Sequence, residues 1–408
     1  MDTAIVIGGG PAGLVAASVL AEAGADTTVL EAKAGLGGRA ASDRREGFDL
    51  NQGPHALYAG GPAMRELAAL GIDPPRWNPA SPTRSVLLRG GRPRRTVGGP
   101  RTVAAIGGLL RRALAAPAGL ERVSVAEWLE AELPDPAARE AAAALVRVTT
   151  FVADHDRLSA DVAAEQLRLG TRSGVRYLRG GWQSLVDALA AQAGRRGATL
   201  RVGSAVRSLE RRGAGWTVGT DAGECEADVV IVAAGLPAAA AKLVGDRVAA
   251  PGPPAAVSSL DLGLRRLPRP RRTFGLGIDE PTYVSRHSPP ERRDGVLMTV
   301  ASYAQQPLEA LERAADAVQP GWRDELVLHR HLPRMVPVSA IATVEAGGMP
   351  GRPGAAVPDA AGLFLAGDWV GPEGWLVDAA LASGAAAARA VLAGGRRTPA
   401  AVPHGSRG

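Results

Sequence analysis

The chain has 408 residues and a formal net charge of +6, and only Lys33 and Lys242 of its 47 basic residues are lysines. Nucleic-acid binding would require the positive charge to gather on one face, whereas the arginines are spread along the sequence, so we do not expect a nucleic-acid partner. The single cysteine, Cys225, excludes an intramolecular disulfide, and no Cys/His cluster has the spacing of a metal site.

The first 31 residues predict a dinucleotide-binding βαβ unit. Residues 4–7 predict a buried strand, residues 8–13 read Gly-Gly-Gly-Pro-Ala-Gly before an alanine-rich helix, and residues 27–31 predict a second strand. Glu31 ends that strand, where a carboxylate accepts hydrogen bonds from a ribose diol and repels a 2′-phosphate. The unit therefore favours NAD or FAD over NADP.

Each small residue of the turn has a separate expected role. Gly8 allows the tight turn, Gly10 lets a pyrophosphate approach the backbone, and Gly13 allows close packing of helix on strand. The phosphates are expected at the positive end of the helix, beside Pro11 and Ala12.

Three later segments decide between the two dinucleotides. Residues 35–39 read Gly-Leu-Gly-Gly-Arg, residues 227–235 predict a strand that ends in Ala-Ala-Gly, and residues 362–368 predict a strand that ends in Gly-Asp. A helix follows through residues 378–391. With these segments the chain resembles the FAD-containing superfamily of amine oxidases, protoporphyrinogen oxidases and phytoene desaturases, and most closely the phytoene dehydrogenase-like oxidoreductases.

The resemblance implies FAD, bound without a covalent bond because Gly374-Trp375 stands where some amine oxidases carry a linking cysteine. It assigns Arg39 to the phosphates and Asp368 to the ribityl chain, and it points the last helix at the flavin pyrimidine. The other FAD-contacting positions that it implies are Ala32, Gly37, Gly38, Gly53, Pro54, His55, Val206, Ala234, Gly235, Gly367, Gly374, Trp375 and Leu376.

The resemblance also implies an α/β fold in which a discontinuous Rossmann-type FAD domain carries an inserted α+β substrate domain. We assign residues 1–75, 195–248 and 350–394 to the FAD domain, and residues 76–194 and 249–349 to the substrate domain. The tail, residues 395–408, is rich in Gly, Arg, Pro and Ser, and we expect it to be disordered.

Within the inserted region, residues 85–93 predict a hairpin with a Gly-Gly turn, and residues 101–170 predict helices. Ser124 and Glu127 have the spacing of a capping box. Strands are expected near residues 256–264, 296–303 and 338–345, with residues 332–337 as a kinked linker. His329 and His331 share one face of a strand-like run, which we interpret as ordinary surface or core positions rather than metal ligands.

Three residues are candidates for work on the substrate. The resemblance places residues 48–58 along the flavin, so that His55 and Tyr58 face the substrate cavity. His55 suits a general base near neutral pH, although a structural histidine is an equal alternative. Trp375 is expected beside the flavin as an apolar wall, with core packing as the alternative.

The leading hypothesis is an FAD-dependent dehydrogenase or oxidase that takes hydride from a C–C or C–N bond of a mostly apolar small molecule. Many amine oxidases carry a lysine that holds water at the flavin, but the corresponding strand, residues 255–264, has none. This favours a desaturase-like reaction. An amine oxidase and a non-redox flavin isomerase or cyclase remain alternatives.

The first expected strand begins at residue 4, which leaves no room for a signal peptide, and no run reaches the roughly 18 uninterrupted apolar residues of a membrane span. We therefore expect a cytoplasmic enzyme, with contact at a membrane surface left open. The electron acceptor, O2 or another compound, and the oligomeric state are not indicated by the sequence.

Overall fold

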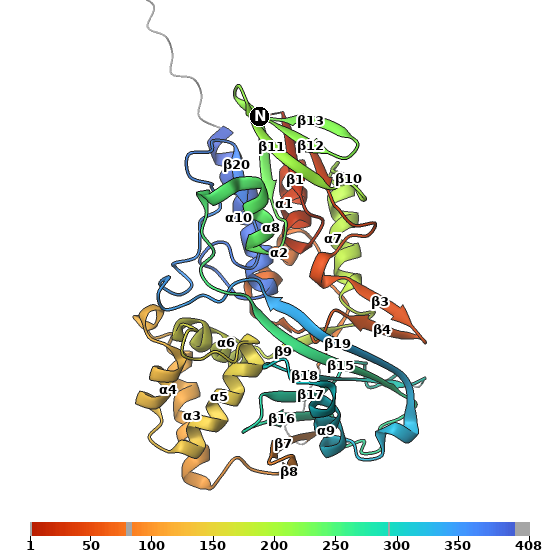
Figure 1. The fold of residues 1–408 in the computed structure, drawn as a ribbon, viewed down its shortest axis with the longest axis vertical. Coiled ribbons are helices and arrows are strands. Elements are labelled where there is room, and N and C mark those ends of the chain that lie inside the picture. The colour runs from red at the N-terminus through yellow and green to blue at the C-terminus, as the bar shows by residue number, and fades with distance from the viewer. Residues whose placement is uncertain (1, 79–83, 293, 396–408) are drawn as a thin grey trace, which may run out of the picture.

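The computed structural model describes residues 2–78, 84–292 and 294–395 (Figure 1). The predicted disordered tail, residues 395–408, lies outside these ranges except for Gly395, which ends the last helix. In Figure 1 the dinucleotide-binding part occupies the upper half of the molecule, and a helical group and a second sheet occupy the lower half.

A five-stranded parallel sheet forms the centre of the upper part, in the order β10-β2-β1-β14-β20. Its strands come from three separated parts of the chain, as a discontinuous Rossmann-type domain requires, and every neighbouring pair is parallel. The strands are β1 (Thr3–Ile7), β2 (Asp26–Leu30), β10 (Thr199–Arg201), β14 (Val229–Val232) and β20 (Leu363–Leu365).

Both faces of this sheet are covered, which explains why its central strands β1 and β14 and the neighbouring β20 are almost entirely apolar. Three helices bury one face: α1 (Pro11–Glu22), α7 (Gln183–Arg195) and α10 (Val377–Gly395). A three-stranded meander and α8 (Pro237–Val244) bury the other face. The strands of the meander are β11 (Val206–Arg212), β12 (Gly215–Thr220) and β13 (Gly223–Ala227).

Helix α7 lies on the sequence boundary that we expected between the two domains. Its apolar residues Leu185, Val186 and Leu189 are fully buried in one cluster with Leu14 and Val15 of α1. The chain therefore returns to the dinucleotide-binding part before residue 195. The domain boundary that we expected at that residue remains a prediction.

Within the described ranges, one helix is long and apolar enough to span a membrane by length and composition, the segment Val377–Gly394 of α10. Inside the molecule 56% of that segment is buried. It crosses α1 so closely that a Cβ added at Gly384 would lie 2.2 Å from the carbonyl oxygen of Ala12. This is the packing of a core helix.

The lower part is built on a seven-stranded mixed sheet in the order β19-β15-β18-β17-β16-β7-β8. The expected strands near 256–264 and 296–303 and the expected hairpin at 85–93 all belong to it. Its strands are β7 (Ser85–Arg89), β8 (Arg92–Arg94), β15 (Ala255–Leu264), β16 (Phe274–Gly277), β17 (Thr282–Arg286), β18 (Val296–Ser302) and β19 (Leu326–Val338).

The strand expected at residues 338–345 is wrong, because β19 ends at Val338 and contains the segment 332–337 that we expected to be a linker. β19 is an edge strand, and its pairing with β15 shifts register at three places, two of which lie on either side of Val257. An edge strand with bulges tolerates residues that cannot donate a backbone hydrogen bond, so Pro333 and Pro337 do not end the strand.

One face of this sheet packs on α9 (Leu308–Val318), and the other packs on the helical group drawn in yellow and orange in Figure 1. The group consists of α3 (Pro100–Leu114), α4 (Val125–Glu132), α5 (Pro136–Thr150) and α6 (Ala160–Arg172). The predicted capping box is present, since the amide of Glu127 donates to the Ser124 hydroxyl and the Ser124 amide donates to the Glu127 carboxylate.

Short elements join the two parts. They are β3 (Ser42–Arg45), β4 (Phe48–Asn51), β5 (Leu57–Tyr58), α2 (Pro62–Ala69), β6 (Arg76–Trp77) and β9 (Val175–Leu178). β3 and β4 form a hairpin, and β9 lies between β5 and β6.

Candidate active site

A cavity of about 1640 Å³ extends from the turn after β1 to the helical group of the lower part. It lies beyond the carboxyl ends of the parallel strands, which is where ligands bind in open α/β sheets. Pockets for one drug-sized ligand are roughly 300–1,000 Å³, so this cavity has room for a dinucleotide and a substrate together.

The glycine turn forms the wall at the dinucleotide end. A Cβ added at Gly8, whose φ is +111°, would lie 2.4 Å from the carbonyl oxygen of Ala233, and one added at Gly13 would lie 2.0 Å from that of Gly8. Gly10 has only the Gly37 oxygen nearby, at 3.9 Å. The turn therefore presents open backbone at Gly10 and the first turn of α1 to the cavity, as a pyrophosphate requires.

Glu31 is held in place by the backbone. The amide of Gly9 donates to its Oε2 and the amide of Lys33 donates to its Oε1, both at 2.8 Å. The carboxylate lines the cavity opposite Val206, where the adenosine end of a dinucleotide is expected. A fixed carboxylate at this place fits a ribose diol.

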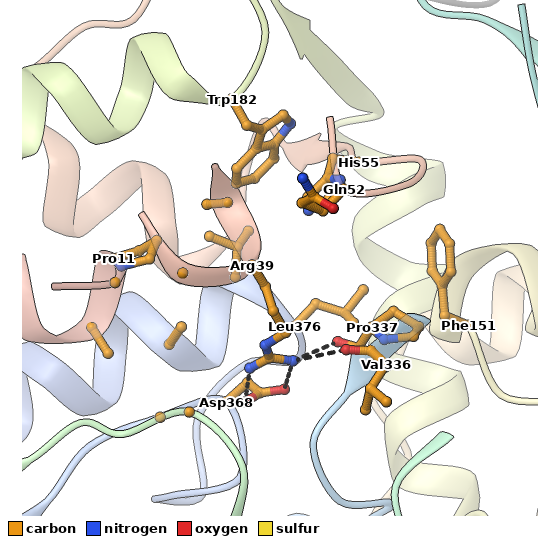
Figure 2. Close-up of a pocket in the computed structure, with 18 of the residues that line it drawn as sticks. Pro11, Arg39, Gln52, His55, Phe151, Trp182, Val336, Pro337, Asp368 and Leu376 are labelled. Carbon is orange, nitrogen blue, oxygen red and sulfur yellow. Dashed lines mark hydrogen bonds and ion pairs between the residues drawn. The ribbon is translucent and has the colours of Figure 1, made fainter. Parts of the chain in front are cut away.

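Arg39 and Asp368 form an ion pair in the middle of the cavity (Figure 2). Arg39 also donates from Nη1 to the carbonyls of Val336 and Pro337, at 3.3 and 3.1 Å. Burial alone would raise the pKa of Asp368, but the Arg39 guanidinium and the Ser339 amide hold it below its ordinary value. Asp368 therefore stays ionised, and its oxygens accept hydrogen bonds.

Most of the predicted site residues line this cavity. They are Gly8, Gly10, Pro11, Ala12, Glu31, Ala32, Gly38, Arg39, Pro54, His55, Tyr58, Val206, Ala234, Gly235, Gly367, Asp368 and Leu376. FAD therefore fits the cavity at one continuous set of backbone amides and fixed acids.

Four of the predicted glycines do not line the cavity but shape its wall from behind. Gly13 packs on Gly8, and Gly37 donates its amide to the Gly9 carbonyl at 2.8 Å. A Cβ at Gly53 would lie 2.0 Å from the Met335 sulfur, and one at Gly374 would lie 2.9 Å from the backbone of α10. These positions require glycine because of neighbouring protein atoms.

Trp375 is not at the cavity, so its expected place beside the flavin is wrong. Its side chain is 1% exposed and belongs to the core of the helical group. The indole N–H donates to the carbonyl of Thr150 at 2.9 Å, which satisfies it inside the core. The next residue, Leu376, has a φ of +55° and lines the cavity instead.

His55 lies in the cavity wall near Trp182, with ring centroids 4.9 Å apart (Figure 2). Its Nδ1 is 2.8 Å from the Gly53 carbonyl, and because a carbonyl only accepts, the proton lies on Nδ1 and Nε2 is left as the base. Desolvation lowers the pKa of His55, and repulsion by Arg39 adds to this. The imidazole is therefore neutral at pH 7.

Tyr58, the second candidate for substrate contact, is buried at the same side of the cavity. Its hydroxyl donates to the carbonyl of Thr149 on α5 at 3.3 Å. Burial raises the pKa of Tyr58 far above its ordinary value, and the charge of Asp378 adds to this. The phenol is a hydrogen-bond donor rather than a base.

The end of the cavity next to the lower part is aromatic, although only 4% of the chain is aromatic. Tyr58, Tyr177 and Tyr283 line it together with Phe151 and Phe274. The fourth tyrosine of the chain, Tyr303, stacks behind Tyr283 with ring centroids 5.9 Å apart. We call this the aromatic end.

Sequence reasoning found Tyr58 but missed the rest of the aromatic end, whose side chains come from the residue after α5 and from β9, β16 and β17. These segments lie between residues 151 and 283, and none carries a recognisable motif. The one available signal was the scarcity of aromatic residues, since few of them were left to fill an ordinary core.

Charges along the cavity are distributed unevenly. Among the residues that the structure describes, the carboxylates that line it are Glu31 and Asp368, both at the dinucleotide end. Both lysines of the chain also line it, Lys33 beside Glu31 and Lys242 on α8. The aromatic end therefore has neither a carboxylate nor a lysine in its wall.

The histidine pair of β19 lies away from the cavity. His329 is exposed, with its Nε2 3.7 Å from Glu312, and His331 is half-buried. In the part of the chain that the structure describes, no three His, Cys, Asp or Glu side chains are grouped to hold a metal.

Comparison with known proteins agrees with this architecture. The family model for flavin-containing amine oxidoreductases matches residues 11–264. AofH of Mycobacterium tuberculosis, described as a flavin-containing monoamine oxidase, is 31% identical over 263 residues, 56% of either chain. The chain thus spans about half the length of the curated relatives it matches.

Solved structures with the same fold cover nearly the whole chain. Putrescine oxidase bound to putrescine superimposes with a TM-score of 0.73 at 21% identity, over 96% of this chain and 99% of the other. Cyclohexylamine oxidase from Brevibacterium oxydans IH-35A gives a TM-score of 0.74 at 17% identity, over 97% and 100%.

The family model covers more than half of the chain, and the cavity has the dinucleotide cradle that such a family requires. The chain belongs to the flavin-containing amine oxidoreductase family.

Proposed function

We propose that this enzyme takes hydride from a C–C or C–N bond of a mostly apolar small molecule that carries no positive charge, in a desaturase-like reaction. The observation that carries the proposal is the aromatic end, whose wall has no carboxylate to balance a cationic substrate. An ammonium group placed there would lose its hydration without an ion pair in return.

The proposed division of the cavity follows from its two walls. FAD, bound without a covalent bond, would lie along the Gly8–Gly13 turn, Glu31 and Asp368, and would supply the hydride acceptor. The aromatic end would hold the substrate against the Pro54–His55 segment. Tyr58 and the neighbouring apolar side chains would exclude water from it.

His55 is the proposed base or hydrogen-bond partner of the substrate. Its Nε2 is unprotonated because Nδ1 donates to Gly53, and the lowered pKa keeps the ring neutral. A neutral imidazole at the wall takes up a proton from a C–H or N–H group without first losing one.

An amine oxidase is the second candidate, supported by the names of AofH, putrescine oxidase and cyclohexylamine oxidase. The rings of Phe151, Phe274 and Tyr283 would receive an amine in its neutral form. The aromatic end has no lysine in its described wall, which counts against the mechanism of the many amine oxidases in which a lysine holds water at the flavin.

We also propose a cytoplasmic location.

A third candidate, a flavin isomerase or cyclase without net redox change, is separated by one experiment. The purified holoenzyme is mixed without oxygen with apolar cyclic and unsaturated compounds, and flavin absorbance and products are followed together. Bleaching by a compound alone, with a dehydrogenated product, supports the proposal. An isomerised product with an unbleached flavin contradicts it.

A further inference from the structure

We infer that the substrate carries a carboxylate, which Arg176 and Asn78 bind at the edge of the cavity while the apolar body of the substrate reaches the aromatic end. This inference rests on the proposed function, because it assigns the substrate to that end of the cavity.

The backbone brings these two residues together. On one side of β9, Arg176 pairs with Leu57 of β5. Leu57 lies two positions after His55 in the sequence. On the other side Tyr177 pairs with Trp77 and Leu178 pairs with Arg76. Continuing this antiparallel register by one residue sets Asn78 opposite Arg176, and both residues line the cavity.

Arg176 is the cavity arginine that has no acidic partner. Arg39 is paired with Asp368, and Arg207 is paired with Asp221 at 2.7 Å. Within residues 2–78, 84–292 and 294–395, no ion pair involves Arg176, whose Nη1 donates to the Val175 carbonyl at 2.9 Å. The residues outside those ranges include no aspartate or glutamate that would neutralise it.

The surroundings fit a ligand with acceptor atoms. Asn78 is exposed and Arg176 is half-buried, so the pair lies where the cavity meets solvent. A guanidinium binds a carboxylate through two parallel hydrogen bonds, and an amide N–H adds a third. A single guanidinium matches one carboxylate, whereas a diphosphate would call for several cations.

The orientation of the substrate follows from this placement. A carboxylate held between Arg176 and Asn78 leaves the attached apolar chain inside the cavity, whose wall also includes Tyr58, Tyr177 and His55. The bond to be oxidised is then distant from the charge. A cationic amine of the same shape is repelled at the edge of the cavity.

The test measures binding to the holoenzyme through the change in its flavin absorbance spectrum. The probes are 4-cyclohexylbutanoate, its uncharged amide and the corresponding primary amine. The variants are Arg176→Gln, Arg176→Lys and, as a matched control, Arg179→Gln, since Arg179 pairs with Glu291 outside the cavity wall.

Wild-type protein is expected to bind the carboxylate more tightly than the amide, and the amine most weakly. Arg176→Gln is expected to weaken carboxylate binding roughly ten- to a hundredfold while amide binding changes by less than about twofold. Arg176→Lys keeps the positive charge but not the two parallel N–H donors of the guanidinium, so its loss of carboxylate affinity should be intermediate. Arg179→Gln should bind like the wild type.

Equal binding of carboxylate and amide by the wild type, or an Arg176→Gln variant with unchanged carboxylate affinity, overturns the inference. Neither result touches the proposed function, which depends on bleaching of the flavin. Conversely, a protein whose flavin no apolar compound bleaches contradicts the proposed function even where the carboxylate probe binds.

Discussion

Arg39 and Asp368 lie 329 positions apart in the sequence, and their side chains meet in a two-point ion pair. Arg39 Nη2 is 2.6 Å from Oδ1 of Asp368, and Nη1 is 3.2 Å from Oδ2. Because Arg39 also binds the backbone at the end of β19, one guanidinium joins the turn after β2, the loop after β20 and the sheet of the lower part.

Asp368→Ala removes the anion from this junction. The folded protein should lose about 2 kcal/mol of stability, below the usual cost of breaking a buried pair because the Arg39 side chain is 39% exposed. FAD content after purification should fall as well. Urea unfolding of the apoprotein measures the first effect, and titration with FAD measures the second.

The matched control is Asp43→Ala, which breaks the exposed pair between Asp43 and Arg45. It should cost less than about 1 kcal/mol and leave FAD binding unchanged. If the two variants behaved alike, the junction would have no special part in the fold or in FAD binding.

Gly13→Ala should destabilise the protein by about 2 kcal/mol or more, because its Cβ would lie 2.0 Å from the carbonyl oxygen of Gly8. Gly194→Ala on α7 is the control, since its Cβ would meet no atom within 4 Å, and it should stabilise the protein by about 0.5 kcal/mol. Thermal unfolding measures both. A Gly13→Ala protein of wild-type stability would refute the close helix–strand contact.

Trp375→Phe separates a core residue from a flavin neighbour. The variant loses the hydrogen bond to Thr150 and leaves a small void, so stability should fall by about 2–3 kcal/mol. The visible spectrum of bound FAD should not change. A shifted flavin spectrum with unchanged stability would place the indole at the flavin after all.

His287 makes the protein sensitive to acid. Its ring stacks on Tyr177 at a centroid distance of 4.4 Å, and burial, with repulsion by His55, lowers the pKa of His287 to about 3. In the unfolded chain His287 takes up a proton near the ordinary pKa of about 6.5. The contribution of neutral His287 to the free energy of unfolding is therefore fully present above that pH and is lost as the pH falls toward 3.

His287→Phe keeps the stacking and removes the titration. Between pH 6 and 4.5 the free energy of unfolding of the variant should fall less steeply than that of the wild type. The two slopes should differ by about 1.4 kcal/mol per pH unit. Urea unfolding at several pH values measures this slope. A His287→Phe slope equal to that of the wild type would show that His287 protonates freely in the folded protein.

The sequence predicted the dinucleotide end well because its chemistry depends on local backbone. Gly8, Gly10 and Glu31 belong to one βαβ unit, and Asp368 lies in the loop that follows β20 of the same sheet. These positions are set by steric rules that a short motif records.

The remaining misses have long-range causes. Trp375 is buried in the core of the helical group, whereas the next residue, Leu376, has a φ of +55° and lines the cavity. β19 continues through Pro333 and Pro337 because it is an edge strand, which depends on sheet order. The aromatic end arises where β5, the end of α5, β9 and the β16–β17 pair meet, and no local pattern encodes that meeting.

The proposed function is tested most directly with matched pairs of compounds in which an amino group of one member is replaced by a methyl group in the other. The rate of anaerobic flavin bleaching is measured for each member by stopped flow. The uncharged member is expected to bleach the flavin at least about tenfold faster, equivalent to about 1.4 kcal/mol of transition-state stabilisation. Faster bleaching by the amines would contradict it and make the enzyme an amine oxidase.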